Sequence, residues 1–142
     1  MAAVPGPAPD YDAKITTVTY RTQDRGVLVD ATGLLAWPYG LEAHARPDIL
    51  LLLHGTQGFT DGCSLDKSAE TRALVAYFAS LGYVVVAPDY LGLKAVEPPT
   101  GFPHPYLVGQ ATAIASLDMV RVAGRMGGAA YDDVQPRPRV VM

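Results

Sequence analysis

An unbroken run of five apolar residues, Ile49 to Leu53, is the feature that most restricts the fold of this chain. A strand with one face in water alternates apolar and polar side chains, but this run has no polar position. We therefore expect a strand buried on both faces, as in a parallel sheet covered by helices. A second run of the same kind, Tyr83 to Ala87, follows later in the chain.

The segment between these two runs predicts a helix, because its large apolar residues recur at intervals of three and four. These residues are Leu74, Tyr77, Phe78 and Leu81. Ser64 or Asp66 is placed to cap the first turn, and Gly82 suits the position after the last turn. Strand, helix and strand together form a βαβ unit.

A second helix is predicted from Tyr106, with Pro105 favourable at its first position, to Gly127-Gly128. Apolar residues at helical spacing mark its expected buried side. They are Leu107, Ala111, Ile114 and Leu117. A polar connection through Asp132, Asp133 and Pro136 then leads to Arg139-Val140-Val141-Met142, which we expect to be the beginning of a third parallel strand.

The amino-terminal part predicts an antiparallel hairpin. Residues Ile15 to Arg21 and Val27 to Trp37 favour strands, Gln23 to Gly26 supplies turn residues, and Pro38 is expected to end the second strand. Residues 1–13 are predicted to be a flexible lead-in, and residues 14–142 one domain. The order β-β-β-α-β-α-β indicates an open α/β sheet, whose ligands bind at the carboxyl ends of the parallel strands.

Composition and charge exclude several classes of function. The 142 residues are 49% apolar and 18% charged, as in a globular domain. A formal charge of −3 with scattered basic residues predicts no binding to nucleic acid or anionic lipid. No apolar run approaches the roughly 20 residues of a membrane helix, and the first residues lack the pattern of a signal peptide, so we expect no integral membrane segment. The cellular location stays open.

The segment His54-Gly55-Thr56-Gln57-Gly58 follows directly on the first apolar run. Its two glycines allow the backbone to turn sharply and to present N–H groups to a ligand. Donors of this kind suit the negatively charged oxygen of a tetrahedral intermediate in acyl transfer. The segment is therefore a candidate oxyanion loop.

The order of elements and three motifs resemble the amino-terminal half of the α/β-hydrolase superfamily. The motifs are Leu53 to Gly58, Val86-Ala87-Pro88-Asp89-Tyr90-Leu91-Gly92 and His104-Pro105-Tyr106-Leu107. Within the superfamily the chain is most similar to bacterial esterases and lipases of the secretory-lipase type, over about Ile15 to Met142. The resemblance implies a serine hydrolase whose substrates are small-molecule or lipid-like carboxylic esters.

The resemblance also implies roles for residues. The backbone N–H of Thr56, with Gln57 as the neighbouring candidate, would be one oxyanion donor, and His54, Gly55 and Gly58 would shape the loop. The family nucleophile lies on a Gly-x-Ser-x-Gly turn, which occurs nowhere in this sequence, and the acid and histidine of the triad follow it. We expect a chain truncated at the start of the nucleophile strand, lacking the carboxy-terminal half and inactive alone.

Other polar residues have weaker functional interpretations. Ser64, Asp61 and His54 could form a local triad, but nothing in the sequence holds the serine on a sharp strand-to-helix turn. Cys63 is the single cysteine and could be a thiolate near a helix start, although an inert thiol or half of a disulfide is commoner. Asp89 is expected to stabilise the loop after its strand, and His104 to belong to a turn or helix cap.

No cofactor is implied, because the sequence has neither metal-ligand spacing nor a glycine-rich phosphate loop. Four aromatic residues fall in the loops at the expected ligand edge of the sheet, where they could line an acyl pocket or simply cover the strand ends. They are Phe59, Tyr90, Phe102 and Tyr106.

Three alternatives to an esterase stay open at this point. The chain could be a non-catalytic binding module that keeps the sheet without the reaction. It could be one half of a split hydrolase completed by a second polypeptide. Within the family, a peptidase, a thioesterase or a dienelactone hydrolase shares this amino-terminal half, because specificity lies mostly in later loops.

Overall fold

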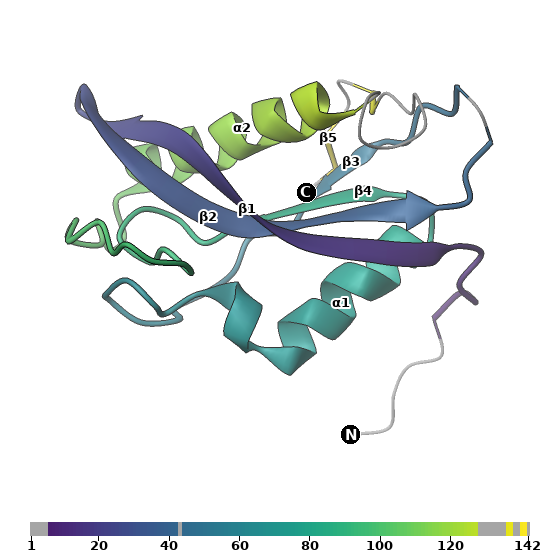
Figure 1. The fold of residues 1–142 in the computed structure, drawn as a ribbon, viewed down its shortest axis with the longest axis horizontal. Helices are drawn as coiled ribbons and strands as arrows, with labels where there is room; N and C mark the ends of the chain where they lie inside the picture. The colour runs from purple at the N-terminus through teal and green to yellow at the C-terminus, as the bar shows by residue number, and fades with distance from the viewer. Residues whose placement is uncertain (1–5, 43, 128–135, 138–139, 142) are drawn as a thin grey trace.

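A computed structural model of the chain describes residues 6–42, 44–127, 136–137 and 140–141. In these residues five strands form one mixed sheet, in the spatial order β1-β2-β4-β3-β5 (Figure 1).

The first part of the sheet is antiparallel. Strands β1 (Asp12–Asp24) and β2 (Val27–Tyr39) form a long hairpin, and β2 also pairs antiparallel with β4 (Val84–Pro88). Because residue 33 of β2 pairs with residue 88 of β4, the hairpin turn extends beyond the carboxyl end of β4. Both hairpin strands are longer than the sequence predicts, and β2 continues through Pro38 beyond the part that pairs with β4.

The second part of the sheet is parallel, as the two apolar runs predict. Strand β3 (Ile49–Leu51) lies between β4 and β5 (Val140–Val141), parallel to both. The Leu52 N–H extends this ladder by donating to the carbonyl of Val86 at 2.9 Å. The ends of the predicted last strand, Arg139 and Met142, lie outside the described residues, as do Gly128, Asp132 and Asp133.

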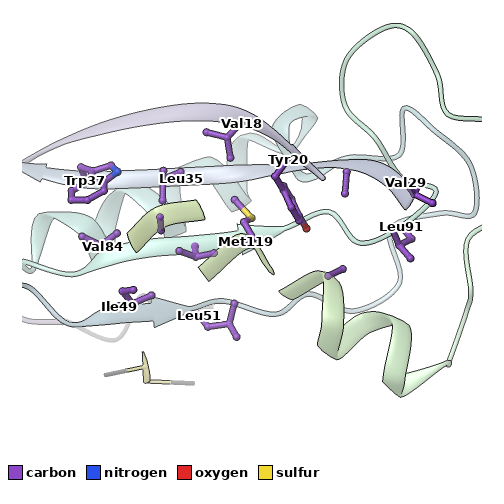
Figure 2. Packing of buried hydrophobic residues seen from close by; sticks show 14 of the residues in the cluster. Val18, Tyr20, Val29, Leu35, Trp37, Ile49, Leu51, Val84, Leu91 and Met119 are labelled. Carbon is purple, nitrogen blue, oxygen red and sulfur yellow. The ribbon is translucent and has the colours of Figure 1, made fainter. Parts of the chain in front are cut away.

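Helices α1 (Ala69–Ser80) and α2 (Gly109–Met126) cover opposite faces of the sheet (Figure 1). The core is therefore divided in two. Val84 and Val86 of β4 point into the cluster beneath α2, which Figure 2 shows around Leu35 and Met119. Val85, the residue between them, points to the α1 side. Burial of β4 on both faces confirms the interpretation of the second apolar run. The first run meets the prediction in part, because β3 ends at Leu51 and Leu53 is 48% exposed.

The predicted cap of the first helix is wrong. A short 3-10 turn, η1 (Leu65–Lys67), follows Ser64, whose side chain makes no capping bond. The cap is Ser68, whose Oγ accepts a hydrogen bond from the N–H of Thr71 at 3.1 Å. Leu74 is exposed and Val75 is buried, so the packed face is rotated from the one that the largest residues indicate. Gly82 does take a positive φ of 95° after the last turn, as predicted.

The second helix begins three residues later than predicted, at Gly109 rather than Tyr106. Leu107 has a φ of 59°, which no right-handed helix can contain, so Pro105 belongs to a turn instead. Leu107 and Leu117 are exposed, and Ile114 is only half-buried. The face against the sheet is made of small residues and one methionine: Ala111, Ala115, Ser116, Met119 and Ala123.

The first strand begins at Asp12, two residues before the predicted domain start. The N–H groups of Asp10 and Tyr11 both donate to the carbonyl of Ser80 at 3.0 Å, which joins this segment to the end of α1. Residues 1–5 of the predicted lead-in lie outside the described residues.

Candidate functional site

A pocket of about 210 Å³ lies at the carboxyl ends of β3 and β4. Its walls come from the loop after β3, the loop after β4, and the turn and first residues of α2. The lining residues are His54, Gly55, Thr56, Gln57, Tyr90, Leu93, His104, Tyr106, Leu107 and Thr112. The candidate oxyanion loop therefore faces a cavity at the edge where an α/β sheet places its ligands.

His54 begins this loop and is held by Tyr90. The two rings stack with centroids 4.1 Å apart, the His54 N–H donates to the Tyr90 hydroxyl at 3.1 Å, and that hydroxyl approaches the His54 carbonyl at 3.2 Å. The His54 Nδ1 lies 2.6 Å from the carbonyl of Gly55. Because a carbonyl can only accept, Nδ1 carries the proton in this contact. These contacts fix the position of the His54 ring at the start of the candidate oxyanion loop.

The backbone N–H groups of Thr56 and Gln57 make no hydrogen bond within the described residues. Both residues are exposed at the pocket. Backbone donors in native structures are normally paired with protein or water. A loop with two open donors beside a cavity has the chemistry of an anion-binding site.

Gly58 is the position in the loop that requires glycine. Its φ is 146°, and a Cβ there would lie 2.4 Å from the Sγ of Cys63. Gly55 differs, because a Cβ there would meet open space and its φ is not in the left-handed region. Of the two glycines that the sequence analysis selected, Gly58 alone is needed by the backbone.

Tyr90 and Leu107, which both line the pocket, have φ values of 67° and 59°. Positive φ is uncommon for bulky residues and costs on the order of 1–3 kcal/mol, and such strain concentrates at functional sites. Burial raises the pKa of the Tyr90 hydroxyl, although its hydrogen bond with the His54 backbone acts the other way. Sequence patterns contain no signal for either backbone conformation.

Tyr106 reaches the oxyanion loop from the turn before α2. Its hydroxyl lies 2.9 Å from the Oγ1 of Thr56. Its ring meets Phe59 edge-on at a centroid distance of 5.1 Å and lies 6.1 Å from the ring of His104. The motif Leu53 to Gly58 and the motif His104 to Leu107 therefore meet at the contact between Thr56 and Tyr106.

The four predicted aromatic residues do not share one cavity. Tyr90 and Tyr106 line the pocket of the oxyanion loop. Phe59 and Phe102 line a neighbouring hollow of about 310 Å³ with Thr60, Asp61 and Pro103. Phe102 also packs against the core cluster under α2.

Asp61 connects the segment that follows the candidate oxyanion loop to the loop after β4. Its Oδ1 accepts from the N–H of Lys94 at 3.0 Å, and its Oδ2 accepts from the N–H and hydroxyl of Thr100 at 2.7 and 2.8 Å and from the N–H of Gly101 at 2.9 Å. Partial burial alone would raise the pKa of Asp61, but these hydrogen bonds outweigh it and lower the pKa.

The local triad of Ser64, Asp61 and His54 is not assembled. The buried Ser64 Oγ has no hydrogen-bond partner among the described residues, and the Asp61 carboxylate is occupied by the other loop. Cys63 lies between Asp61 and Ser64 in the sequence, and its Sγ is 3.8 Å from the Thr60 hydroxyl. Hydrogen bonds from the backbone and side chain of Thr60 lower the pKa of this thiol.

Asp89 is buried directly after β4 and ties three segments together. Its Oδ2 accepts from the Thr32 hydroxyl at 2.6 Å, and its Oδ1 accepts from the N–H of Leu65 at 2.7 Å. Burial raises the pKa of Asp89, although both hydrogen bonds oppose the shift. Thr32 also accepts from the N–H of Ala95 at 2.7 Å, a supporting role that nothing in a strand sequence reveals.

His104 belongs to the turn before α2, where its Nδ1 lies 2.7 Å from the carbonyl of Leu91. No three His, Cys, Asp or Glu side chains in the described part of the chain gather closely enough to hold a metal ion. Across the same residues, neither helix has the length and apolar character that crossing a membrane requires.

An antiparallel hairpin, parallel strands, helices on both faces and a His-Gly loop at the carboxyl end of β3 define an α/β-hydrolase fold of the esterase and lipase kind, of which this chain forms a part. Solved structures support this class. The chain is similar to a hydrolase of inferred function from Legionella pneumophila, with 28% identity and a TM-score of 0.72 over 90% of this chain and 34% of that one.

Two esterases are also similar to this chain. The rice cell wall degrading esterase LipA from Xanthomonas oryzae shares 30% identity, with a TM-score of 0.67 over 81% of this chain and 30% of LipA. Esterase Est22, at 17% identity and a TM-score of 0.56 over 92% of this chain and 34% of Est22, is similar in fold alone. The chain thus spans about a third of the length of these structures. No protein-family model and no curated protein sequence matches it.

Proposed function

We propose that this chain supplies the oxyanion loop of a serine hydrolase that acts on carboxylic esters. The proposal rests on the N–H groups of Thr56 and Gln57, which lie beside a pocket at the carboxyl end of β3 and have no hydrogen-bond partner among the described residues. The similarity to LipA supports ester substrates over peptides, because that relative is an esterase.

The proposed chemistry assigns one role to this chain. A serine oxygen adds to the ester carbonyl carbon, its proton passes to a histidine base, and the carbonyl π electrons move onto the carbonyl oxygen. The N–H of Thr56, with Gln57 beside it, donates to that oxyanion. The bond to the alcohol then breaks, the alcohol takes the proton from the base, and water removes the acyl group by the same steps.

The proposed scheme places its serine, acid and base outside residues 1–142. The sequence has no Gly-x-Ser-x-Gly turn, and His54 is bound to Gly55 and stacked on Tyr90. This same observation favours a second candidate, a binding module that keeps the fold without the reaction, or one half of a split hydrolase.

The first test compares the complete protein that carries this chain with residues 1–142 alone. We expect the complete protein to hydrolyse p-nitrophenyl butyrate and to be labelled by a fluorophosphonate, and residues 1–142 to do neither. Absence of both signals in the complete protein would overturn the proposal in favour of a binding module. Activity that appears only on mixing with a second polypeptide would indicate a split enzyme.

A second test isolates the backbone donor. Thr56→Pro removes both the N–H and the hydroxyl, whereas Thr56→Ala removes the hydroxyl alone. We expect kcat to be about 100- to 1000-fold lower in the proline variant than in the alanine variant, the usual effect of losing one oxyanion donor. Circular dichroism spectra of the two variants check that both are folded. Equal kcat values in two folded variants would exclude Thr56 as the donor.

A further inference from the structure

The oxyanion loop has few connections to the rest of the molecule. Among the described residues, one hydrogen bond joins residues 55–58 to another segment of the chain, and it is the 2.9 Å contact between Thr56 Oγ1 and the Tyr106 hydroxyl. The contact joins residues that are 50 positions apart. The backbone N–H of Thr56, like that of Gln57, has no partner among the described residues.

Tyr106 is well placed to hold this loop, because the turn that carries it is itself held. The Tyr106 N–H donates to the His104 carbonyl at 2.8 Å, and the Val108 N–H donates to the Pro105 carbonyl at 3.1 Å. The His104 ring contacts the carbonyl of Leu91 in the loop after β4. The aromatic edge contact with Phe59 orients the ring from the other side.

We infer that Tyr106 is a positioning residue for the oxyanion loop, which it serves through the side chain of Thr56. The inference rests on the proposed function, because it names what keeps the proposed donor in place. The hydroxyl pair restrains Thr56, and the restraint keeps its N–H oriented before charge develops on the substrate. Preorganised donors stabilise a transition state because they need no rearrangement during the reaction.

This mechanism predicts an effect on kcat rather than on KM. The ground-state ester carbonyl is a weak acceptor, so its binding depends little on the orientation of the loop, whereas the oxyanion depends on it strongly. One neutral hydrogen bond of ordinary strength corresponds to roughly a 5- to 10-fold change in rate.

The test is a double-mutant cycle in the complete protein with p-nitrophenyl butyrate as substrate. Tyr106→Phe removes the hydroxyl and keeps the ring against Phe59, and Thr56→Val removes the other hydroxyl at nearly equal volume. We expect each variant to lower kcat about 5- to 10-fold with KM little changed, and the double variant to be no slower than either single variant. Thr56→Ser, which keeps the hydroxyl, should retain more kcat than Thr56→Val.

A matched control is Tyr77→Phe, because the Tyr77 hydroxyl donates to the Pro7 carbonyl beside α1, on the face of the sheet opposite α2. We expect this variant to keep the wild-type kcat. A wild-type kcat in Tyr106→Phe would overturn the inference. A double variant as slow as the product of the two single effects would also overturn it, because Tyr106 would then act on the substrate independently of Thr56.

A second readout does not depend on activity. Amide hydrogen exchange of residues 55–58 should become faster in Tyr106→Phe and in Thr56→Val to a similar extent, and stay unchanged in Tyr77→Phe. Unchanged exchange in Tyr106→Phe would overturn the positioning role even where the enzyme is active. The two ideas can also fail separately. If the wild-type protein hydrolyses no ester, the proposed function is rejected. Faster exchange in Tyr106→Phe and Thr56→Val would then still show that Tyr106 holds the loop.

Discussion

Asp89 accepts a hydrogen bond from the backbone N–H of Leu65 at 2.7 Å, and this bond joins the end of β4 to the start of η1. The other carboxylate oxygen accepts from the Thr32 hydroxyl of β2. Leu65 is almost completely buried, so its N–H has no access to water as an alternative partner. Asp89 therefore anchors the segment that leaves the candidate oxyanion loop, whereas the sequence predicts that it stabilises the loop after its own strand.

Replacing Asp89 with alanine should lower the free energy of unfolding by about 2–4 kcal/mol, because two buried donors lose their acceptor. Asp89→Asn should cost less, since the amide oxygen can still accept one of the two bonds. Urea denaturation of the purified protein measures both effects. Asp30→Ala is the control, because Asp30 pairs with Arg21 at the surface, where water and salt screen such pairs and they contribute little to stability. Equal losses at the two positions would contradict the anchoring role.

The raised pKa of Asp89 also predicts a pH dependence of stability. Burial makes the folded protein hold this proton to a higher pH than the unfolded chain, in which the pKa is near 3.8. Between 3.8 and the folded pKa the folded state binds more protons, so the Asp89 contribution to stability is full below pH 3.8 and falls as pH rises.

The measurement is the difference in unfolding free energy between wild type and Asp89→Asn as a function of pH. We expect the wild type to lose stability relative to the variant as pH increases from about 4. Asp61, whose lowered pKa gives the opposite slope, is present in both proteins and cancels. A relative stability that increases with pH would show that the pKa of Asp89 is lowered instead.

Gly58 should be the least replaceable residue of the oxyanion loop. Alanine at this position combines an unfavourable φ of 146° with a contact of 2.4 Å to the Sγ of Cys63. We expect Gly58→Ala to cost about 1–3 kcal/mol, as residues in such backbone regions do. Adding Cys63→Ala should recover only a small part of this loss, because it removes the sulfur but keeps the Cβ of residue 63 at 2.6 Å from the added Cβ, and it leaves the backbone strain.

Gly55→Ala is the matched control for Gly58, because a Cβ there meets open space. Thermal unfolding of the three variants decides between the two glycines. A Gly55→Ala variant as unstable as Gly58→Ala would mean that both glycines are needed by the backbone, as the sequence pattern alone predicts.

The sheet could be predicted because its signal is local. Two unbroken apolar runs require burial on both faces, and the structure buries Val84, Val85 and Val86 completely. The packed face of α2 could not be predicted in the same way. Large residues such as Leu107 and Leu117 dominate the apolar pattern, but the helix packs on the sheet through the alanines at 111, 115 and 123, which carry a weak hydrophobic signal.

In the candidate site too, local features could be predicted from the sequence and long-range contacts could not. The His54-Gly55 loop is recognisable because the residues that form it are contiguous and follow a buried strand. The contact between Thr56 and Tyr106 is not, because it depends on how a turn before α2 returns to the sheet edge. The sequence offers Asp61 as the acid of a local triad. In the structure its carboxylate accepts four hydrogen bonds from a distant loop, and these depend on tertiary structure that no sequence spacing indicates.

Alanine substitutions at Ser64 and Ser68 test which of these residues caps the first helix. The sequence predicts a helix cap at Ser64 or Asp66, but Ser68 Oγ accepts from both the N–H and the hydroxyl of Thr71, at 3.1 and 3.0 Å. Ser68→Ala should therefore lower the free energy of unfolding by about 1 kcal/mol. Ser64→Ala should be neutral or slightly stabilising, because it removes a buried hydroxyl that has no partner among the described residues. Chemical denaturation measures both variants, and an ester hydrolysis assay of the complete protein should find Ser64→Ala as active as wild type. A loss of hydrolysis in Ser64→Ala would support the local triad of Ser64, Asp61 and His54, which the geometry argues against.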